Sequence, residues 1–202
     1  MNRAEIPVDV DVLRGEIVKT YTDVSTASGE EFIFPTGRWW AAELGYPEPA
    51  LSRIPDETVA SFAGVANHWL LGRVEPGSVV LDLGCGAGTD LLIAAQMTGL
   101  EGRVVGVDMT ASMLDRARAG AGTMGLANVD LREALIEELP LEDSSVDAVI
   151  SNGVFDLVPD KAAVFGEIDR VLRPGGLLQF ADVTIRHEVS EDARERIDLW
   201  TG

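Results

Sequence analysis

One short segment constrains the fold more than any other part of the chain. Residues 78–83 read Ser-Val-Val-Leu-Asp-Leu, a pattern typical of a buried strand. The loop that follows has glycine at positions 84, 86 and 88, and residues 90–97 are predicted to be helical. Glycines at such a junction let the backbone turn tightly and approach a ligand closely. The segment therefore predicts a strand–loop–helix unit whose loop can hold a ligand.

The same alternation continues along the chain. Thr110 is an expected N-cap for a helix that contains Met113 and Leu114, and a second amphipathic helix is predicted over residues 161–172, stopped by Pro174-Gly175-Gly176. Further strands are predicted over residues 104–108, 128–131, 146–150 and 177–185. Strands that alternate with helices form βαβ units with right-handed crossovers. We therefore predict an α/β fold around a mostly parallel sheet.

The first 75 residues have a different character, because Pro and Gly interrupt their helix-like pieces. Leu13, Ile17 and Tyr21 share one helical face, which predicts a helix over about residues 9–25. Shorter helices are predicted over residues 38–45 and 56–70. The chain is thus divided into an N-terminal helical cap or lid, residues 1–75, and a regular α/β domain, residues 76–202.

Composition excludes several classes of partner. The chain has 16 Lys and Arg against 34 Asp and Glu, a formal charge of −18. A phosphate backbone or an anionic membrane surface attracts clustered Lys and Arg, so we expect no nucleic-acid partner and no membrane. No apolar run reaches the length of a membrane-spanning helix, and the N-terminus has no signal-peptide pattern. A single cysteine, Cys85, excludes an internal disulfide, and we expect a cytoplasmic protein without a bound metal.

Two acidic residues give the glycine loop its chemistry. Asp108 ends the predicted second strand, twenty residues after Gly88, where an acid can accept hydrogen bonds from two ribose hydroxyls. Nicotinamide and flavin dinucleotides prefer the spacing G-x-G-x-x-G, with their pyrophosphate at the helix N-terminus. Here the glycines alternate with single residues, and Asp82 lies two residues before the first one. A carboxylate there opposes a pyrophosphate but suits the sulfonium and ammonium groups of S-adenosylmethionine.

Four motifs carry a resemblance to a known family. They are VLDLGCGAGTD (80–90), GVDMT (106–110), EELPLEDSSVDAVISNGVFDLVPDK (137–161) and RVLRPGGLL (170–178). Residues 78–185 thereby resemble the class I S-adenosylmethionine-dependent methyltransferases. More narrowly, they resemble the arsenite methyltransferases and the related quinone-biosynthesis C-methyltransferases. The resemblance covers about half of the chain, and it implies a Rossmann-like sheet and S-adenosylmethionine as the cofactor.

The resemblance also implies roles for individual residues. Asp108 would hold the ribose, Met109 would pack on the adenine ring, and Asn152 would face the methionine end of the cofactor. Tyr21 would cover the cofactor as a lid residue, although a core aromatic explains it equally well. The remaining implied contacts are the loop around the methionine part, Asp82, Gly84, Gly86 and Gly88, and the adenine-side wall, Leu135 and Ile136.

The chain departs from the arsenite branch at its thiols. Soft trivalent arsenic is held by cysteine thiolates. Gly153 stands where that branch has a cysteine, and residues 61–67 lack the cysteine expected near them. Many relatives also place an acid at the position of Leu135 to bind the adenine amino group. We therefore expect a small-molecule acceptor other than arsenite, and an adenine contact made by backbone or by another side chain.

A further expectation concerns the last predicted strand. Only 17 residues follow Ile185, whereas the class I sheet normally adds two more strands. We therefore expect a sheet that lacks these two strands, with the fifth strand at its edge and its backbone groups unpaired. Two explanations stay open: the chain is truncated, or a partner chain, such as a second copy in a homodimer, covers this edge.

The catalytic candidates are the two histidines, His68 and His187, because a base is needed only if the acceptor must lose a proton. For both, a surface or hydrogen-bonded histidine is the simpler interpretation. Three functions remain open on the sequence alone: a methyltransferase, a nicotinamide-dependent oxidoreductase, and a cofactor-binding module without catalysis.

Overall fold

The protein contains one five-stranded parallel sheet. The computed structural model describes residues 8–26, 32–184, 186, 196 and 200. In the described residues the strands run in the spatial order β3-β2-β1-β4-β5, and all neighbouring pairs are parallel. Their bounds are β1 Val79–Leu83, β2 Arg103–Asp108, β3 Val129–Glu133, β4 Val146–Asn152 and β5 Leu172–Ala181. This arrangement confirms the α/β fold and the parallel sheet.

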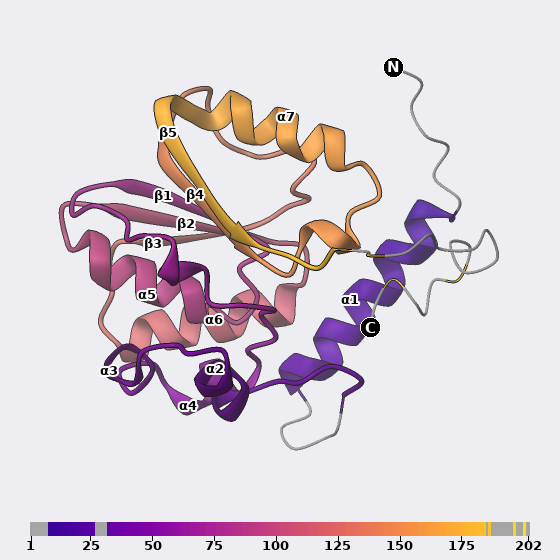
Figure 1. Ribbon diagram of the computed structural model, residues 1–202, viewed down its shortest axis with the longest axis horizontal. Helices are drawn as coiled ribbons and strands as arrows, with labels where there is room; N and C mark the ends of the chain where they lie inside the picture. Colours follow the sequence, from indigo (N-terminus) through magenta and orange to yellow (C-terminus); the bar gives the residue numbers. More distant parts are fainter. Residues whose placement is uncertain (1–7, 27–31, 185, 187–195, 197–199, 201–202) are drawn as a thin grey trace.

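Helices cover both faces of the sheet (Figure 1). Helices α5 (Thr89–Thr98) and α6 (Ala111–Thr123) lie on one face, and α7 (Lys161–Val171) lies on the other. Successive residues of β1 alternate between the two sides: Val80 belongs to the hydrophobic cluster with α5 and α6, and Leu81 to the cluster with α7. Because both sides are buried, the strand is apolar along its length except for Asp82, which belongs to the site.

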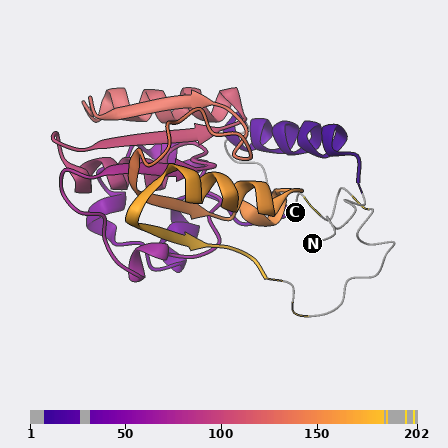
Figure 2. The ribbon, with the colours of Figure 1, turned by 90° about the horizontal axis from the view of Figure 1, so that it is seen from above.

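The long helix α1 (Val10–Thr26) lies beyond the carboxyl ends of the strands (Figure 2). Its C-terminal end packs against α6, where Val24 joins a small cluster with Ala87 and Met113. Ser25 Oγ donates to Ser112 Oγ at 2.7 Å. These contacts hold α1 above the loops that follow the strands. In the described part of the chain, neither α1 nor any shorter helix is long and apolar enough to cross a membrane.

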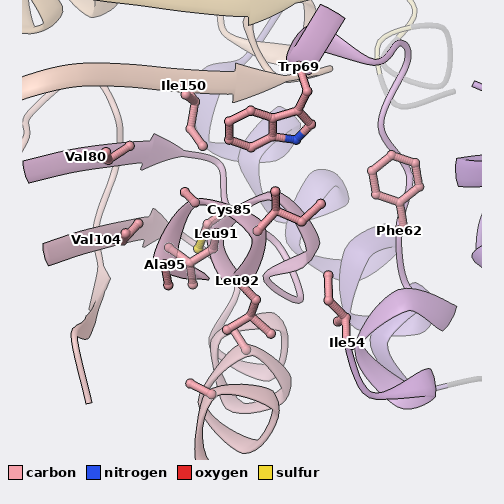
Figure 3. Packing of buried hydrophobic residues seen from close by; sticks show 14 of the residues in the cluster. Ile54, Phe62, Trp69, Val80, Cys85, Leu91, Leu92, Ala95, Val104 and Ile150 are labelled. Atoms are coloured by element: carbon pink, nitrogen blue, oxygen red, sulfur yellow. The ribbon is translucent and has the colours of Figure 1, made fainter. Parts of the chain in front are cut away.

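Short helices between residues 38 and 70 pack on the α5 face. They are α2 (Arg38–Glu43), α3 (Glu48–Leu51), α4 (Asp56–Ala60) and the 3-10 helix η1 (His68–Leu70). Figure 3 shows Ile54, Phe62 and Trp69 from this segment around Leu91 and Leu92 of α5. The N-terminal segment and the sheet therefore share one hydrophobic core, while the domain boundary near residue 75 stays a prediction.

The predicted helix over residues 56–70 is wrong in its middle. It divides into α4 and η1, and residues 61–67 form a loop between them. Two hydrogen bonds of the Asn67 side chain fix the end of this loop. Asn67 Nδ2 donates to Gly45 O at 2.7 Å, and Asn67 Oδ1 accepts from Trp69 N at 3.1 Å. The second contact is the local N-cap of η1, whereas the first depends on Gly45, a distant residue that the helical pattern alone does not show.

Strand β5 begins five residues earlier than predicted. Val146 pairs with Leu172, and Ala148 pairs with Leu177, so residues 173–176 bulge out of the ladder. Gly175 sits at this bulge with φ of +85°, a conformation that glycine adopts without strain. Within the described residues, β5 pairs only with β4 and forms an edge of the sheet; Ile185, the predicted end of the strand, lies outside them.

Candidate cofactor-binding site

A cavity lies between α1 and the carboxyl ends of the strands, with about 1050 Å³ of empty space that includes its open mouth. The sheet contributes the loop after β1, residues 108–110 after β2, residues 134–137 after β3 and residues 152–154 after β4. Arg14, Ile17 and Tyr21 of α1 form the opposite wall. Open parallel sheets bind their ligands at this position.

The structure brings together all ten residues that the sequence predicts at the cofactor. The lining contains Tyr21, Asp82, Gly84, Gly86, Gly88, Asp108, Met109, Leu135, Ile136 and Asn152. These residues come from five stretches of the chain: α1, β1 with its following loop, the end of β2 with its following loop, the loop after β3, and the end of β4. Their shared position supports one binding site, and the contact that each residue makes to the ligand stays a prediction.

Asp82 is a buried acid at the cavity wall. The residue is 3% exposed, and its Oδ2 has no hydrogen-bond partner among the described residues. Burial, followed by the nearby acids Asp90 and Asp108, raises the pKa of this carboxyl well above its usual value. A buried acid among other acids is stabilised by a nearby cation, because the cation lowers the cost of ionisation. The cavity therefore favours a cationic group beside Asp82.

Asp108 connects the end of β2 to the glycine loop. Its Oδ2 accepts from Gly86 N at 2.9 Å, and its Oδ1 accepts from Thr110 N at 2.8 Å. Burial raises the pKa of Asp108, and the backbone donors of Thr110 and Gly86 oppose this shift. The residue thus orders the loop while its carboxylate remains part of the cavity wall.

Two positions of the loop, 84 and 86, are occupied by glycine for different structural reasons. Gly84 has φ of +62°, and a Cβ there would lie 2.5 Å from Val154 Cγ2. Gly86 has φ of +50°, and a Cβ there would meet nothing within 4 Å. Gly84 is therefore required by packing, whereas Gly86 presents bare backbone to open space at the cavity, where a ligand can approach closely.

A buried polar network that the sequence did not reveal joins the N-terminal segment to this wall. At its centre, Asp90 Oδ1 accepts from Tyr46 Oη at 2.8 Å and from Trp69 Nε1 at 2.7 Å. His68 Nε2 lies 3.4 Å from the same oxygen, within ion-pair distance. Burial alone would raise the pKa of Asp90, but hydrogen bonding and charge from His68, with the bonds from Tyr46 and Trp69, lower it.

Asn152 belongs to the same network. Its Nδ2 donates to Tyr46 Oη at 2.9 Å and to Asp90 Oδ2 at 3.2 Å, and its Oδ1 accepts from Val65 N at 2.8 Å. The amide therefore clamps the loop after α4 against the end of β4. The resemblance to the methyltransferases gave Asn152 as a site residue, but no pattern in the sequence pointed to its partners Tyr46 and Asp90.

The structure does not bring His68 to the cavity as a base. The His68 side chain is fully buried, and its Nδ1 lies 3.0 Å from Gln179 Nε2. The residue is absent from the cavity lining, so it holds the network together and has no access to an acceptor. His187 lies outside the described residues.

The single thiol is also unsuited to chemistry. Burial, followed by the charges of Asp108 and Asp82, raises the pKa of Cys85 well above its usual value, so the group stays a neutral thiol. Figure 3 shows its sulfur within the hydrophobic cluster, close to Leu91. Gly153, where a second thiol would stand, has φ of +69°, and a Cβ there would lie 3.0 Å from Val65 Cγ1.

A pair of acids stands close to the cavity, next to residues that line it. Asp182 accepts backbone hydrogen bonds from Val154, Phe155 and Asp156 at 2.7–3.2 Å. Burial, followed by the charge of Asp182, raises the pKa of Asp156 to about 6. Burial, Asp156 and Asp108 also raise the pKa of Tyr21. Within the described residues, no group of three or more His, Cys, Asp or Glu side chains is arranged to hold a metal ion.

These features fit S-adenosylmethionine. The unpartnered oxygen of Asp82 suits a positive sulfonium or ammonium group, and the open space at Gly86 admits a ligand against the backbone. Asp108 offers a carboxylate to a ribose, and Met109, Leu135 and Ile136 form an apolar wall for a ring. The fold and the site together define a nucleoside-binding domain of the Rossmann-like type.

Comparison with known proteins agrees with this class. A family model described as a methyltransferase domain matches residues 74–201. The arsenite methyltransferase of Halobacterium salinarum is 38% identical over 181 residues, which cover 90% of this chain and 43% of that protein. The demethylmenaquinone methyltransferase of Listeria welshimeri is 38% identical over 114 residues, 56% of this chain and 48% of that protein. The chain spans about half the length of the curated relatives it matches.

Solved structures show the same relationship. The arsenic(III) S-adenosylmethionine methyltransferase of Chlamydomonas reinhardtii matches with a TM-score of 0.60 and 36% identity, covering 78% of this chain and 52% of that chain. A methyltransferase from Aquifex aeolicus, 22% identical, shares the fold with a TM-score of 0.60 over 86% of this chain and 79% of that chain. The chain belongs to the S-adenosylmethionine-dependent methyltransferase family, and its cofactor is S-adenosylmethionine. This assignment replaces the nicotinamide alternative.

Proposed function

We propose that the chain transfers the methyl group of S-adenosylmethionine to a small-molecule acceptor. The observation that carries the proposal is the buried, unpartnered carboxylate oxygen of Asp82 in a cavity that Asp108 and the glycine loop also line. An acid in that position favours a cationic ligand over a dinucleotide pyrophosphate. The relatives, which are named as methyltransferases, support the same reaction.

The chain's own residues act by binding, orienting and excluding water. When bound, S-adenosylmethionine supplies a methyl group on a positively charged sulfur. Asp82, Asp108 and the glycine loop would hold the cofactor, with this methyl group available to the acceptor's electron pair. Asp82 holds the positive charge before transfer, and Ile17 and Tyr21 of α1 cover the cavity and keep water out.

The walls near β4 favour an apolar acceptor. Phe62, Val154, Leu157 and Val158 line this part of the cavity. Arsenite is disfavoured because Cys85, the single cysteine in the sequence, is a buried neutral thiol.

A screen for S-adenosylhomocysteine release tests the proposal. The wild-type chain is incubated with S-adenosylmethionine and a panel of small phenols, quinols and apolar amines, with arsenite plus a thiol reductant as a further arm. We expect release with at least one organic acceptor and none above background with arsenite. Release with arsenite would overturn the assignment of the acceptor. Cofactor binding without release from any arm would favour a binding module without catalysis.

We further propose that two copies associate through β5. This strand has a free edge within the described residues, and Leu177 and Phe180 on it are 49% and 38% exposed. Sedimentation velocity should give a dimer for the wild-type chain and a monomer for Leu177→Lys, because a charge at the edge opposes strand pairing. A wild-type monomer would contradict the proposal. A cytoplasmic location likewise stays a prediction.

A further inference from the structure

One ion pair crosses the cavity from α1 to the loop after β3. Arg14 Nη2 donates to Glu137 Oε1 at 2.9 Å, and the two side chains are 30% and 14% exposed. Both residues line the cavity, and Arg14 is the single Lys or Arg among the described residues of its lining. The pair therefore belongs to the wall that a ligand meets, at the end formed by Leu135 and Ile136.

Arg14 has a donor that this pairing leaves unused. Its Nε is buried and has no hydrogen-bond partner among the described residues. A buried donor without an acceptor is costly, so native proteins seldom leave one unpaired unless a ligand or water completes it. Glu137 also keeps acceptor capacity, because a carboxylate offers about four lone-pair sites and Arg14 uses one.

The neighbouring wall is apolar and lacks an acid. Leu135, Ile136 and Met109 present no charged group to the cavity, so none of their side chains can accept from an amino group. An adenine ring has an exocyclic amino donor next to a ring-nitrogen acceptor on one edge. Glu137 and Arg14 offer the complementary set, an acceptor beside a donor, at this end of the cavity.

We propose that Arg14 and Glu137 together recognise the amino-pyrimidine edge of the cofactor's adenine. Glu137 accepts from the exocyclic amino group, and Arg14 Nε donates to the ring nitrogen. The ion pair keeps the two side chains aligned, and it joins α1 to the bound base, so recognition of adenine and covering of the cavity occur together. The inference rests on the proposed cofactor site, and the base contact is its new element.

Calorimetry with two ligands tests the inference without any need for an acceptor. S-adenosylhomocysteine carries the amino group, whereas S-inosylhomocysteine carries a carbonyl oxygen there and a protonated ring nitrogen, which reverses both hydrogen bonds. We expect the wild-type chain to bind S-adenosylhomocysteine about 100-fold more tightly, since a site built around hydrogen-bonding groups rejects an analogue that leaves them unpaired.

Glu137→Gln provides the decisive variant. Its amide can both donate and accept, so the preference should fall by about 10-fold or more, mainly because S-adenosylhomocysteine binds more weakly. Glu138→Gln is the matched control, because it removes the same charge from the next, exposed residue and should leave the preference unchanged. Arg14→Lys keeps a cation for Glu137 but removes Nε, and it should also reduce the preference.

The outcomes separate this inference from the proposed function. If Glu137→Gln and Arg14→Lys weaken both ligands by the same factor, the pair only fastens α1, and the inference is overturned. If the wild-type chain binds S-adenosylhomocysteine but shows no preference between the bases, the inference also fails while the cofactor site stands. If it binds neither ligand, both the proposed function and the inference are wrong.

Discussion

The carboxyl ends of the strands form the floor of the cavity, and the N-terminal segment, residues 10–26 and 32–70, contributes its cover. The floor and the cover are held by different kinds of contact. The floor consists of strand ends in a parallel ladder, where Gly106 pairs with Asp82 and Ile150 pairs with Asp82 from the other side. The cover is tied down by side chains from distant positions, such as Tyr46 and Trp69, which meet on Asp90. A ladder distributes its hydrogen bonds over many residues, whereas several contacts of the cover converge on the single buried carboxylate of Asp90. One substitution should therefore loosen the cover but not the floor.

The largest effect should come from Asp90→Ala. The change leaves Tyr46 Oη, Trp69 Nε1 and His68 without their shared acceptor in a buried site. We expect the free energy of unfolding to fall by about 3–5 kcal/mol, because each buried donor left without its acceptor costs about 1–3 kcal/mol. Urea denaturation measures this loss. Asp115→Ala, which removes an acid that is 75% exposed on α6, should change stability by less than about 0.5 kcal/mol. Equal effects of the two substitutions would show that the cover does not depend on Asp90.

Asp108→Ala tests the floor of the cavity through its affinity for a cofactor analogue. The change removes the carboxylate that faces the cavity and its bonds to Gly86 and Thr110. We expect affinity for S-adenosylhomocysteine to fall by about 1.5–3 kcal/mol, the worth of hydrogen bonds to a charged group. Isothermal titration calorimetry gives the value, with Glu101→Ala on the exposed loop before β2 as the control. Unchanged affinity would mean that other groups hold the ribose.

Tyr46→Phe isolates one link between the cover and the floor. The hydroxyl donates to Asp90 and accepts from Asn152, so its loss leaves both groups with one partner fewer. We expect a loss of about 1–2 kcal/mol in unfolding free energy, less than for Asp90→Ala, because Trp69 still donates to the carboxylate. Thermal and urea unfolding should both show a smaller stability loss for Tyr46→Phe than for Asp90→Ala. A larger loss than that of Asp90→Ala would place the centre of the network at Tyr46.

The smallest effect should be a pH dependence at Asp156. Its pKa is raised to about 6 from 3.8, by burial and then by Asp182, so its contribution to stability is present in full below pH 3.8 and is lost as pH rises through about 6. Asp156→Asn should therefore be more stable than the wild-type chain at pH 8, by about 1 kcal/mol after allowance for its partial exposure. The difference should vanish toward pH 4. Urea denaturation at both pH values measures it, and a difference that does not change with pH would contradict the assignment.

The difference between floor and cover also explains what the sequence could predict. Asp82 and Asp108 lie at or near the carboxyl ends of predicted strands, and together with the glycine loop they indicated one site on the sequence alone. Asn152 was assigned to that site by the resemblance of residues 137–161 to the methyltransferases. Helix α1 was also predictable, because Leu13 and Ile17 repeat at helical spacing and are buried.

The cover could not be predicted, because its contacts join residues far apart in the chain. Tyr46 and Asp90 are 44 positions apart, and Asn152 and Val65 are 87 apart. Residues 61–67 read as helical but form a loop, since Asn152 accepts from the backbone of Val65 and Asn67 donates to the distant Gly45. His68 looked like a candidate base for the same reason: the sequence showed its chemical type but not that Gln179 and Asp90 enclose it.

The most direct test of the account is a pair of calorimetric titrations of the wild-type chain, one with S-adenosylhomocysteine and one with NADH. The central claim is that Asp82, Asp108 and the glycine loop form a site for the adenosyl cofactor of methyl transfer. The account predicts saturable binding of S-adenosylhomocysteine with one site per chain, and no measurable binding of NADH. Tight binding of NADH without binding of S-adenosylhomocysteine would contradict it.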